Sequence, residues 1–252
     1  MSFVHGHCEA RHEPLSQYLA NREFVSSSQL RRFARFGAAA VGSSRGGNFA
    51  GSEMGEALHC LLLEPEEFAE QYLVLDGSVP PKDDVTEDES ARRGWLDAWQ
   101  WSALCKARDA VLACPQAPVA DWLSRGRREL SIYWTDEGGA KWRARPDCFL
   151  SDIVLEIKTT TDCRPDSFAR TRERLNYDVQ AAHYVAAVSQ LTGVTPRFAF
   201  VTVELAAPYP VWVHELGAAE LTRAAEVLER LKGGYLETAA VLCARRGTLP
   251  LS

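Results

Sequence analysis

Residues 143–160, RARPDCFLSDIVLEIKTT, place charged side chains inside two stretches that otherwise have the composition of β-strands. Asp147 lies near the end of the first stretch. Glu156 and Lys158 lie two residues apart in the second, so their side chains project to the same side of a strand. A turn at residues 150–152 would bring Asp147 opposite residues 155–156. Two carboxylates and one ammonium group are therefore predicted to converge where charge is costly to bury.

Converging carboxylates repel each other unless something neutralises them. A divalent cation does so, and oxygen ligands of this kind suit Mg²⁺ or Mn²⁺. Lys158 could then orient or help to deprotonate a water molecule and offset charge on a phosphate group. The pattern predicts metal-dependent phosphodiester hydrolysis, although a short pattern of this kind also arises by chance as a surface ion pair.

The flanking sequence indicates an α/β fold with a central mixed β-sheet flanked by helices. Three strand-like runs separated by Asp-Glu-Gly-Gly and Leu-Ser-Asp turns predict an antiparallel meander. Apolar spacing and capping residues predict the helices, the second of which Pro65 interrupts or ends. The predicted strands are 129–134, 141–149, 153–159, 197–204 and 209–216, and the predicted helices lie within 25–41, 56–75, a tryptophan-rich stretch with Trp95 and Trp99, 117–124, 172–193 and 217–232.

The length and composition of the chain indicate the size of its core and the number of its domains. A chain of 252 residues with 46% hydrophobic content can bury a substantial core. We expect a single domain over residues 1–252, in which 1–125 is mostly helical and carries His59, and 126–252 contains the sheet and its helices. No apolar run is long enough to cross a bilayer and the N-terminus does not resemble a signal peptide, so a cytoplasmic protein without a membrane partner is expected. The seven cysteines form no CxxC pair, which favours reduced thiols over disulfides or a zinc site.

Charge is segregated along the chain. The net charge of −6 argues weakly against a nucleic-acid partner, but a binding face depends on where the charge lies. Residues 22–45 contain five arginines and one acid, whereas residues 64–89 contain ten acids and one lysine. The sequence also predicts two polar loops, a glycine- and serine-rich loop at 42–55 and an acidic loop at 76–90.

Several motifs occur together in the order of a known superfamily. Pro146-Asp147 followed by Glu156-Ile157-Lys158 resembles the PD-(D/E)xK nucleases, and GEALH (55–59) and QAAHY (180–184) resemble the GxxxH and QxxxY motifs of its RecB-like branch. Over about residues 25–205, the stretches MGEALHCLLLEPEEF, ELSIYW, RARPD and EIKTTTD are similar to the exonuclease domain of the RecE family (exonuclease VIII).

The resemblance implies roles for individual residues. Asp147 and Glu156 would bind the metal together with the backbone carbonyl of Ile157, and Lys158 would be the catalytic lysine. His59, in the N-terminal part, would be a third metal-binding side chain, and its nitrogen makes Mn²⁺ as good a candidate as Mg²⁺. This chain has Glu156 where RecE-type sequences often have Asp. Gln180 and Tyr184 would line the site, and Glu129 matches a glutamate near it.

Each of these side chains also has an ordinary structural interpretation. Without the motifs, His59 would be a hydrogen-bonded core histidine, Gln180 and Tyr184 would belong to a packing face, and Glu129 would be a strand-edge charge. Arg143 and Arg145 alternate on the Asp147 strand, and either contact phosphates or lie on a solvated face. Further candidates for gripping the 5′ end or the duplex backbone are Arg31, Arg32, Arg35 and Arg45.

The RecE and lambda-exonuclease type degrades one strand of linear double-stranded DNA from the 5′ end, without ATP, and leaves a 3′ overhang for a single-strand annealing protein in phage or prophage recombination. The chain contains no Walker A signature, which agrees with ATP independence. Such enzymes form rings, so a homo-oligomeric trimer or tetramer is expected. Two alternatives remain: a different nuclease of the superfamily, such as an endonuclease or a single-strand-specific exonuclease, and a non-catalytic DNA-binding protein of the same fold.

Overall fold

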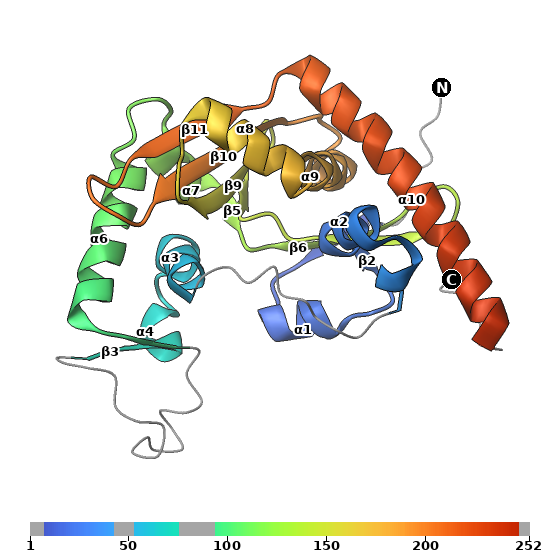
Figure 1. Cartoon of the computed structure of the whole chain (residues 1–252), viewed down its shortest axis with the longest axis horizontal. Helices are drawn as coiled ribbons and strands as arrows, with labels where there is room; N and C mark the ends of the chain where they lie inside the picture. The colour runs from blue at the N-terminus through green and yellow to red at the C-terminus, as the bar shows by residue number, and fades with distance from the viewer. Residues whose placement is uncertain (1–7, 43–52, 76–93, 247–252) are drawn as a thin grey trace, which may run out of the picture.

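The structure is a computed structural model that describes residues 8–42, 53–75 and 94–246 (Figure 1). Most of the predicted glycine- and serine-rich loop, all of the predicted acidic loop at 76–90, and Arg45 lie outside the described residues. The helices are α1 (Leu15–Ala20), α2 (Ser27–Phe36), α3 (Glu53–Leu63), α4 (Phe68–Gln71), α6 (Ala98–Leu112), α7 (Val119–Arg125), α8 (Pro165–Arg174), α9 (Tyr177–Thr192) and α10 (Ala218–Arg246), with a 3-10 turn at Gly37–Ala40.

The strands form a five-stranded sheet, a four-stranded sheet and a short two-stranded one. The five-stranded sheet has the order β11-β10-β9-β8-β5, and the four-stranded sheet has the order β1-β6-β7-β2. The strands are β1 (Cys8–Arg11), β2 (Val25–Ser26), β3 (Tyr72–Val74), β4 (Gly94–Leu96), β5 (Arg127–Arg128), β6 (Ser131–Thr135), β7 (Lys141–Ala144), β8 (Cys148–Phe149), β9 (Ile153–Thr160), β10 (Arg197–Glu204) and β11 (Val211–Glu215).

Strand β9 is the centre of the larger sheet. It pairs in parallel with β10 from Ile153 opposite Arg197 to Thr160 opposite Glu204, and antiparallel with β8. The crossover from β9 to β10 contains α8 and α9, as a parallel pair requires. The predicted mixed sheet flanked by helices is therefore confirmed.

Helices cover both faces of this sheet (Figure 1). Residues Ile153, Leu155 and Ile157 pack into a hydrophobic cluster with α3, α6 and α7. Val154 packs into a second cluster with α2, α9 and α10 on the opposite face. Because side chains alternate along a strand, Glu156 shares the side of Val154 and therefore faces α9.

The predicted three-stranded meander is wrong in one respect, because the chain divides it between the two sheets. Strands β6 and β7 pair antiparallel in the four-stranded sheet, whereas β8 and β9 pair antiparallel in the five-stranded sheet. The predicted strand 141–149 breaks at residues 145–147, where Pro146 has no amide hydrogen to contribute to a ladder. The run 129–134 also breaks, because Glu129 has a φ of 48°. The split places Glu129 and Asp147 between the sheets.

Several predicted helices also differ from those observed. The run 56–75 ends in strand β3, and the closing helix continues beyond residue 232 as α10. The run 172–193 is the end of α8 followed by α9, and Asn176 between them adopts a left-handed conformation with φ 52°. Trp95 lies on β4, because α6 begins only after Asp97, whose side chain accepts a hydrogen bond from the Gln100 amide at 2.7 Å. This N-cap sets the first helical residue.

The N-terminal part contributes strands to the sheets as well as helices. Strand β1 pairs antiparallel with β6, and β2 pairs in parallel with β7. All seven cysteines are free thiols. Among the residues described, no helix combines the length and the apolar character needed to cross a membrane.

Candidate active site

Asp147 occupies the break between β7 and β8 and is buried. Its Oδ2 accepts a hydrogen bond from the Ile157 amide at 2.6 Å, and its backbone carbonyl accepts one from the Glu129 amide at 3.1 Å. Cys148 pairs with Leu155, so the adjacent Asp147 lies beside Glu156, as the turn at 150–152 predicts. The rigid strands on either side fix the position of this carboxylate.

Glu156 uses one carboxylate oxygen for the protein and leaves the other unpaired. Its Oε1 accepts from Lys158 Nζ at 2.5 Å and from Gln180 Nε2 at 2.7 Å. Gln180 Nε2 also lies 3.1 Å from the Tyr184 hydroxyl, one helical turn along α9. Glu156 Oε2 is buried and has no hydrogen-bond partner among the described residues. A buried carboxylate oxygen without a partner is costly, and it indicates a ligand that the protein itself does not supply.

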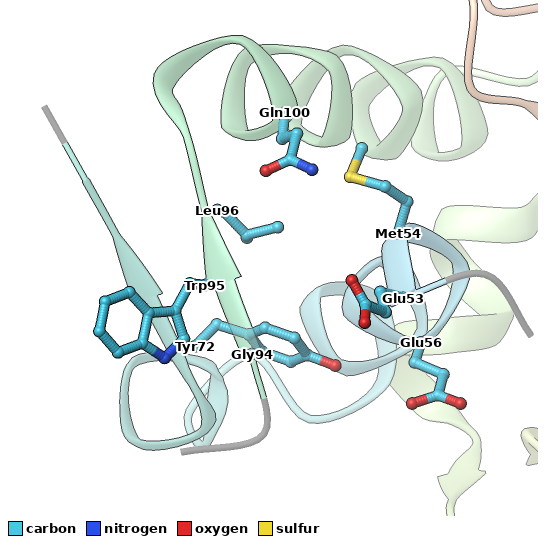
Figure 2. Close-up of a pocket in the computed structure, with 8 residues that line it drawn as sticks. All are labelled: Glu53, Met54, Glu56, Tyr72, Gly94, Trp95, Leu96 and Gln100. Carbon is cyan, nitrogen blue, oxygen red and sulfur yellow. The ribbon is translucent and has the colours of Figure 1, made fainter. Parts of the chain in front are cut away.

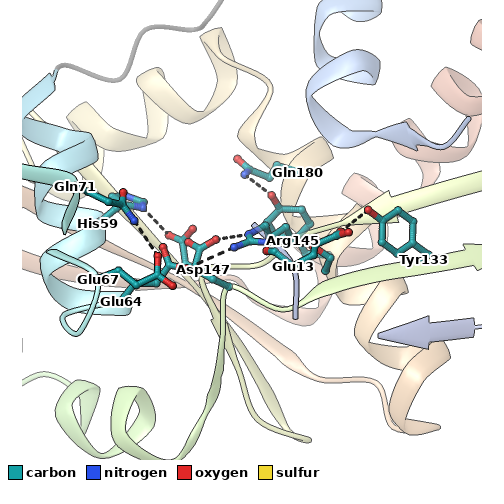
Figure 3. A network of polar contacts seen from close by, with 12 residues as sticks. Glu13, His59, Glu64, Glu67, Gln71, Tyr133, Arg145, Asp147 and Gln180 are labelled. Atoms are coloured by element: carbon teal, nitrogen blue, oxygen red, sulfur yellow. Dashed lines mark hydrogen bonds and ion pairs between the residues drawn. The ribbon is translucent and has the colours of Figure 1, made fainter. Parts of the chain in front are cut away.

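His59 approaches Asp147 from α3. Its Nδ1 lies 3.6 Å from Asp147 Oδ2, and the side chain is 28% exposed. One ligand atom each from His59, Glu129 and Asp147 lies within 4.8 Å of the others. Figure 3 shows His59 and Asp147 facing each other across the gap between α3 and the strand break. Side chains from distant parts of the chain thus converge on Asp147.

The backbone of Glu129 has a conformation that residues other than glycine rarely adopt. Its φ of 48° lies in the left-handed region, which costs a non-glycine residue about 1–3 kcal/mol and persists only where the surroundings impose it. The Arg145 Nε donates to Glu129 Oε2 at 2.6 Å. Strain of this kind concentrates at functional sites; Glu129 lies beside His59 and Asp147, and its role at the site stays a prediction.

Burial and mutual repulsion shift the ionisation of these groups. Burial raises the pKa of Asp147 well above its ordinary value, and the charge of Glu156 raises it further. Burial likewise raises the pKa of Glu129 to about 7, with Asp147 adding to the rise and Arg145 opposing it. Without a cation, carboxyl groups at the site therefore hold protons more tightly than they would in water.

The two basic groups shift in opposite directions. Burial lowers the pKa of His59, and the positive charge of Lys158 lowers it further, which keeps a neutral imidazole nitrogen free to bind a metal. Burial alone would lower the pKa of Lys158, but Glu156 and Asp147 outweigh it and the pKa is raised. Lys158 is therefore a cation near neutral pH.

These residues fit a divalent cation. One nitrogen from His59 and one carboxylate oxygen each from Glu129 and Asp147 lie within 4.8 Å of one another, a donor set that suits Mn²⁺ and Mg²⁺. Glu156 is not in that cluster, but its unpaired Oε2 lies on the strand beside Asp147 and stays a predicted further ligand. The backbone carbonyl of Ile157 remains a predicted ligand.

Three of the arginines predicted to bind DNA are buried instead: Arg31, Arg143 and Arg145. Arg143 donates to the Tyr18 carbonyl and lies over the Tyr18 ring, 4.5 Å from its centre. Because α1 covers this end of the strand, Arg143 has no exposed face for a phosphate. The alternation along 141–147 gave no signal that the N-terminal segment would cover it.

Arg145 joins several segments around the site (Figure 3). Besides Glu129, it contacts the Glu13 carbonyl at 2.8 Å and Glu64 Oε1 at 3.5 Å, and Glu64 follows the helix that carries His59. Tyr133 Oη donates to Glu13 Oε1 at 2.5 Å and so holds the same segment. Arg145 thus braces the site, a role that the sequence pattern missed because its partners are distant in the chain.

The other candidate arginines lie on α2 outside the cluster. Arg32 is half-buried, Arg35 is exposed, and both keep their predicted role in DNA binding as an expectation. A separate small cavity of about 30 Å³ lies between the start of α3 and β4 and contains none of the site residues (Figure 2). It has room for about one water molecule.

The comparison with protein families decides the classification. Residues 26–238 match the family described as "PDDEXK-like domain of unknown function (DUF3799)". The chain belongs to this PDDEXK-like family. The PD-(D/E)xK resemblance of the sequence is confirmed by this match, although the match does not single out the RecE type.

A solved structure shares the fold of this PDDEXK-like domain. The crystal structure of a "Putative exonuclease" from Eubacterium rectale has 17% sequence identity and a TM-score of 0.63, with 90% of this chain and 86% of that chain covered. A second structure, of SSO0001, is 14% identical with a TM-score of 0.34 over 86% and 82% of the two chains, too low to carry an argument. No curated protein matches the chain.

Proposed function

We propose that this PDDEXK-like domain is a divalent-metal-dependent, ATP-independent deoxyribonuclease that degrades linear double-stranded DNA in the 5′-to-3′ direction. One observation carries the nuclease proposal: Asp147, Glu156 and Lys158 converge beside His59, and the buried Glu156 Oε2 lacks a partner among the described residues. Such an arrangement suits a cation and a phosphate group, because a buried carboxylate oxygen without a partner is costly and a cation would neutralise it.

Asp147, Glu156 and His59 would hold the cation, with Glu129 within reach. When bound, a divalent cation polarises a phosphoryl oxygen and lowers the pKa of a water molecule. Lys158, whose Nζ donates to Glu156 Oε1 at 2.5 Å, would be the positively charged group that orients the water and offsets negative charge on the phosphate. The Gln180 side-chain amide donates to Glu156 Oε1 and to the Tyr184 hydroxyl, and these contacts hold Glu156 in place.

The direction and the substrate rest on resemblance. The stretches ELSIYW and EIKTTTD are similar to the RecE exonuclease domain, and the structural neighbour from Eubacterium rectale is itself described as a "Putative exonuclease". On the same basis we propose a homo-oligomeric ring and a single-strand annealing partner that uses the 3′ overhang. The mass of the protein in solution tests the ring.

The proposed activity is tested with three substrates: a 5′-labelled linear duplex, a 3′-labelled linear duplex and a closed circle, each with Mg²⁺, with Mn²⁺ and with EDTA. We expect release of the 5′ label first, an intact circle and no activity in EDTA. Cutting of the circle would indicate an endonuclease, and early release of the 3′ label would reverse the polarity. Activity in EDTA would contradict metal dependence.

A further inference from the structure

We propose that Arg31 is a positioning residue of the site: acting through Gln180, it orients Glu156 so that one carboxylate oxygen faces the cation. The inference rests on the proposed metal site and adds to it a residue that touches neither metal nor DNA. The contacts of three side chains on three elements, α2, α9 and β9, carry it.

Arg31 lies on α2 and is 5% exposed. Its Nη1 donates to Gln180 Oε1 at 3.3 Å, and its Nε donates to the Leu175 carbonyl at 2.9 Å. The guanidinium carbon lies 4.7 Å from the centre of the Tyr177 ring. Leu175 and Tyr177 flank the left-handed residue between α8 and α9. Arg31 therefore holds both the Gln180 amide and the start of the helix that carries it.

The chemistry of these groups fixes the orientation of the Gln180 amide. A guanidinium only donates hydrogen bonds, so the amide oxygen must face Arg31. An ionised carboxylate only accepts them, so the amide nitrogen must face Glu156. A flipped amide would set its oxygen against the Glu156 carboxylate and its N–H groups against Arg31. The charge and the position of Arg31 thus exclude the flipped state.

The orientation of the amide determines which Glu156 oxygen is available. Gln180 and Lys158 both donate to Oε1, at 2.7 and 2.5 Å, and Oε2 is left buried and without a partner among the described residues. Without Arg31, the Gln180 amide can turn and the carboxylate can rotate. Loss of an outer partner of a metal ligand typically weakens metal affinity about 10- to 100-fold.

A direct grip on a DNA phosphate is the competing role for Arg31. Against it, the guanidinium is buried among Gln180, Leu175 and Tyr177. Arg35, on the same helix, is exposed and therefore provides a matched control for the metal measurements.

The test measures Mn²⁺ affinity by isothermal titration calorimetry and, separately, affinity for a short linear duplex in EDTA. For Arg31→Met we expect Mn²⁺ binding to weaken roughly tenfold, with duplex affinity unchanged. Arg31→Lys, which retains a donor, should recover most of the loss, and Arg35→Met should keep the wild-type Mn²⁺ affinity. In a Gln180→Ala background, Arg31→Met should have no further effect, because residues that act through one another are not additive.

Three results would overturn the proposal: an unchanged Mn²⁺ affinity in Arg31→Met, additive losses in the double variant, or a loss of duplex affinity with Mn²⁺ affinity intact. If Arg31→Met does not have the wild-type circular dichroism spectrum, Arg31→Gln, whose side chain is shorter than that of arginine, takes its place. The same loss of Mn²⁺ affinity is expected for Arg31→Gln. Neither measurement involves cleavage. A wild-type protein that binds Mn²⁺ and cuts no DNA would refute the proposed function and leave this inference standing.

Discussion

The strained and half-buried Glu129 makes the metal-free protein less stable as the pH rises. Its folded-state pKa is about 7, raised from an ordinary value of 4.5 mainly by burial. Below pH 4.5 the group is protonated in both the folded and the unfolded chain, so it costs nothing. Between pH 4.5 and about 7 the unfolded chain releases the proton and the folded chain keeps it, so stability falls. Above that range the loss is complete.

The size of the loss follows from the shift. Each pKa unit is worth about 1.4 kcal/mol, so the rise from 4.5 to about 7 corresponds to about 3 kcal/mol. The side chain is 18% exposed, which leaves little solvent to screen the charge. Glu129→Gln removes the titration and keeps an oxygen that can accept the Arg145 hydrogen bond. At pH 8 the variant should be more stable than the wild type by about 3 kcal/mol, and at pH 4.5 by less than about 0.5 kcal/mol.

Urea unfolding in EDTA, followed by circular dichroism at the two pH values, measures this difference. Glu137→Gln, in the exposed turn after β6, is the matched control and should show no difference at either pH. Equal wild-type and Glu129→Gln stabilities at pH 8 would contradict a raised pKa for Glu129. A variant that is less stable at pH 8 would show that the Arg145 ion pair outweighs the cost of burying the charge.

Three further variants test the catalytic lysine, the metal-binding histidine and the packing beside β8. Lys158→Ala should lower the cleavage rate by about 10²–10⁴-fold and leave duplex binding largely intact; wild-type turnover would remove Lys158 from the mechanism. His59→Asn replaces a nitrogen ligand with an oxygen ligand, so the ratio of Mn²⁺- to Mg²⁺-supported cleavage should fall, and an unchanged ratio would argue that His59 is not a ligand. Gly126→Ala would place a Cβ 2.2 Å from Cys148 Sγ and 2.7 Å from the Trp122 carbonyl, so unfolding should cost about 1–3 kcal/mol less; Gly233→Ala, with nothing within 4 Å of its Cβ, should not be destabilised.

Local periodicity explains why part of the site could be predicted from the sequence. Glu156 and Lys158 are two apart on a strand, and Gln180 and Tyr184 are four apart on a helix, so each pair shares a face whatever the rest of the fold does. The structure brings three of these groups together directly, since both Lys158 and Gln180 donate to Glu156. His59 had no such local signal, because nothing in a GxxxH spacing says what the histidine will meet. The prediction that His59 binds the metal came only from the resemblance to the RecB-like nucleases.

Long-range packing explains the errors. Arg143 looked like an exposed strand residue, but α1, more than a hundred residues earlier in the chain, covers it. Arg31 looked like a surface arginine, but α9 covers it. Pro146 was a sequence signal for the division of the meander between two sheets, because proline has no amide hydrogen to donate within an inner strand. The left-handed backbone of Glu129 had no counterpart in the sequence, since this conformation is imposed by the surrounding fold.

Anomalous diffraction from crystals grown with Mn²⁺ is the decisive test of the metal site, because it locates the cation without relying on activity. We expect an anomalous peak in contact with Glu156 Oε2 and Asp147, with His59 Nδ1 or Nε2 as a further ligand. No peak at a saturating Mn²⁺ concentration, or a peak only at other residues, would contradict the assignment of this cluster as the metal site of a nuclease.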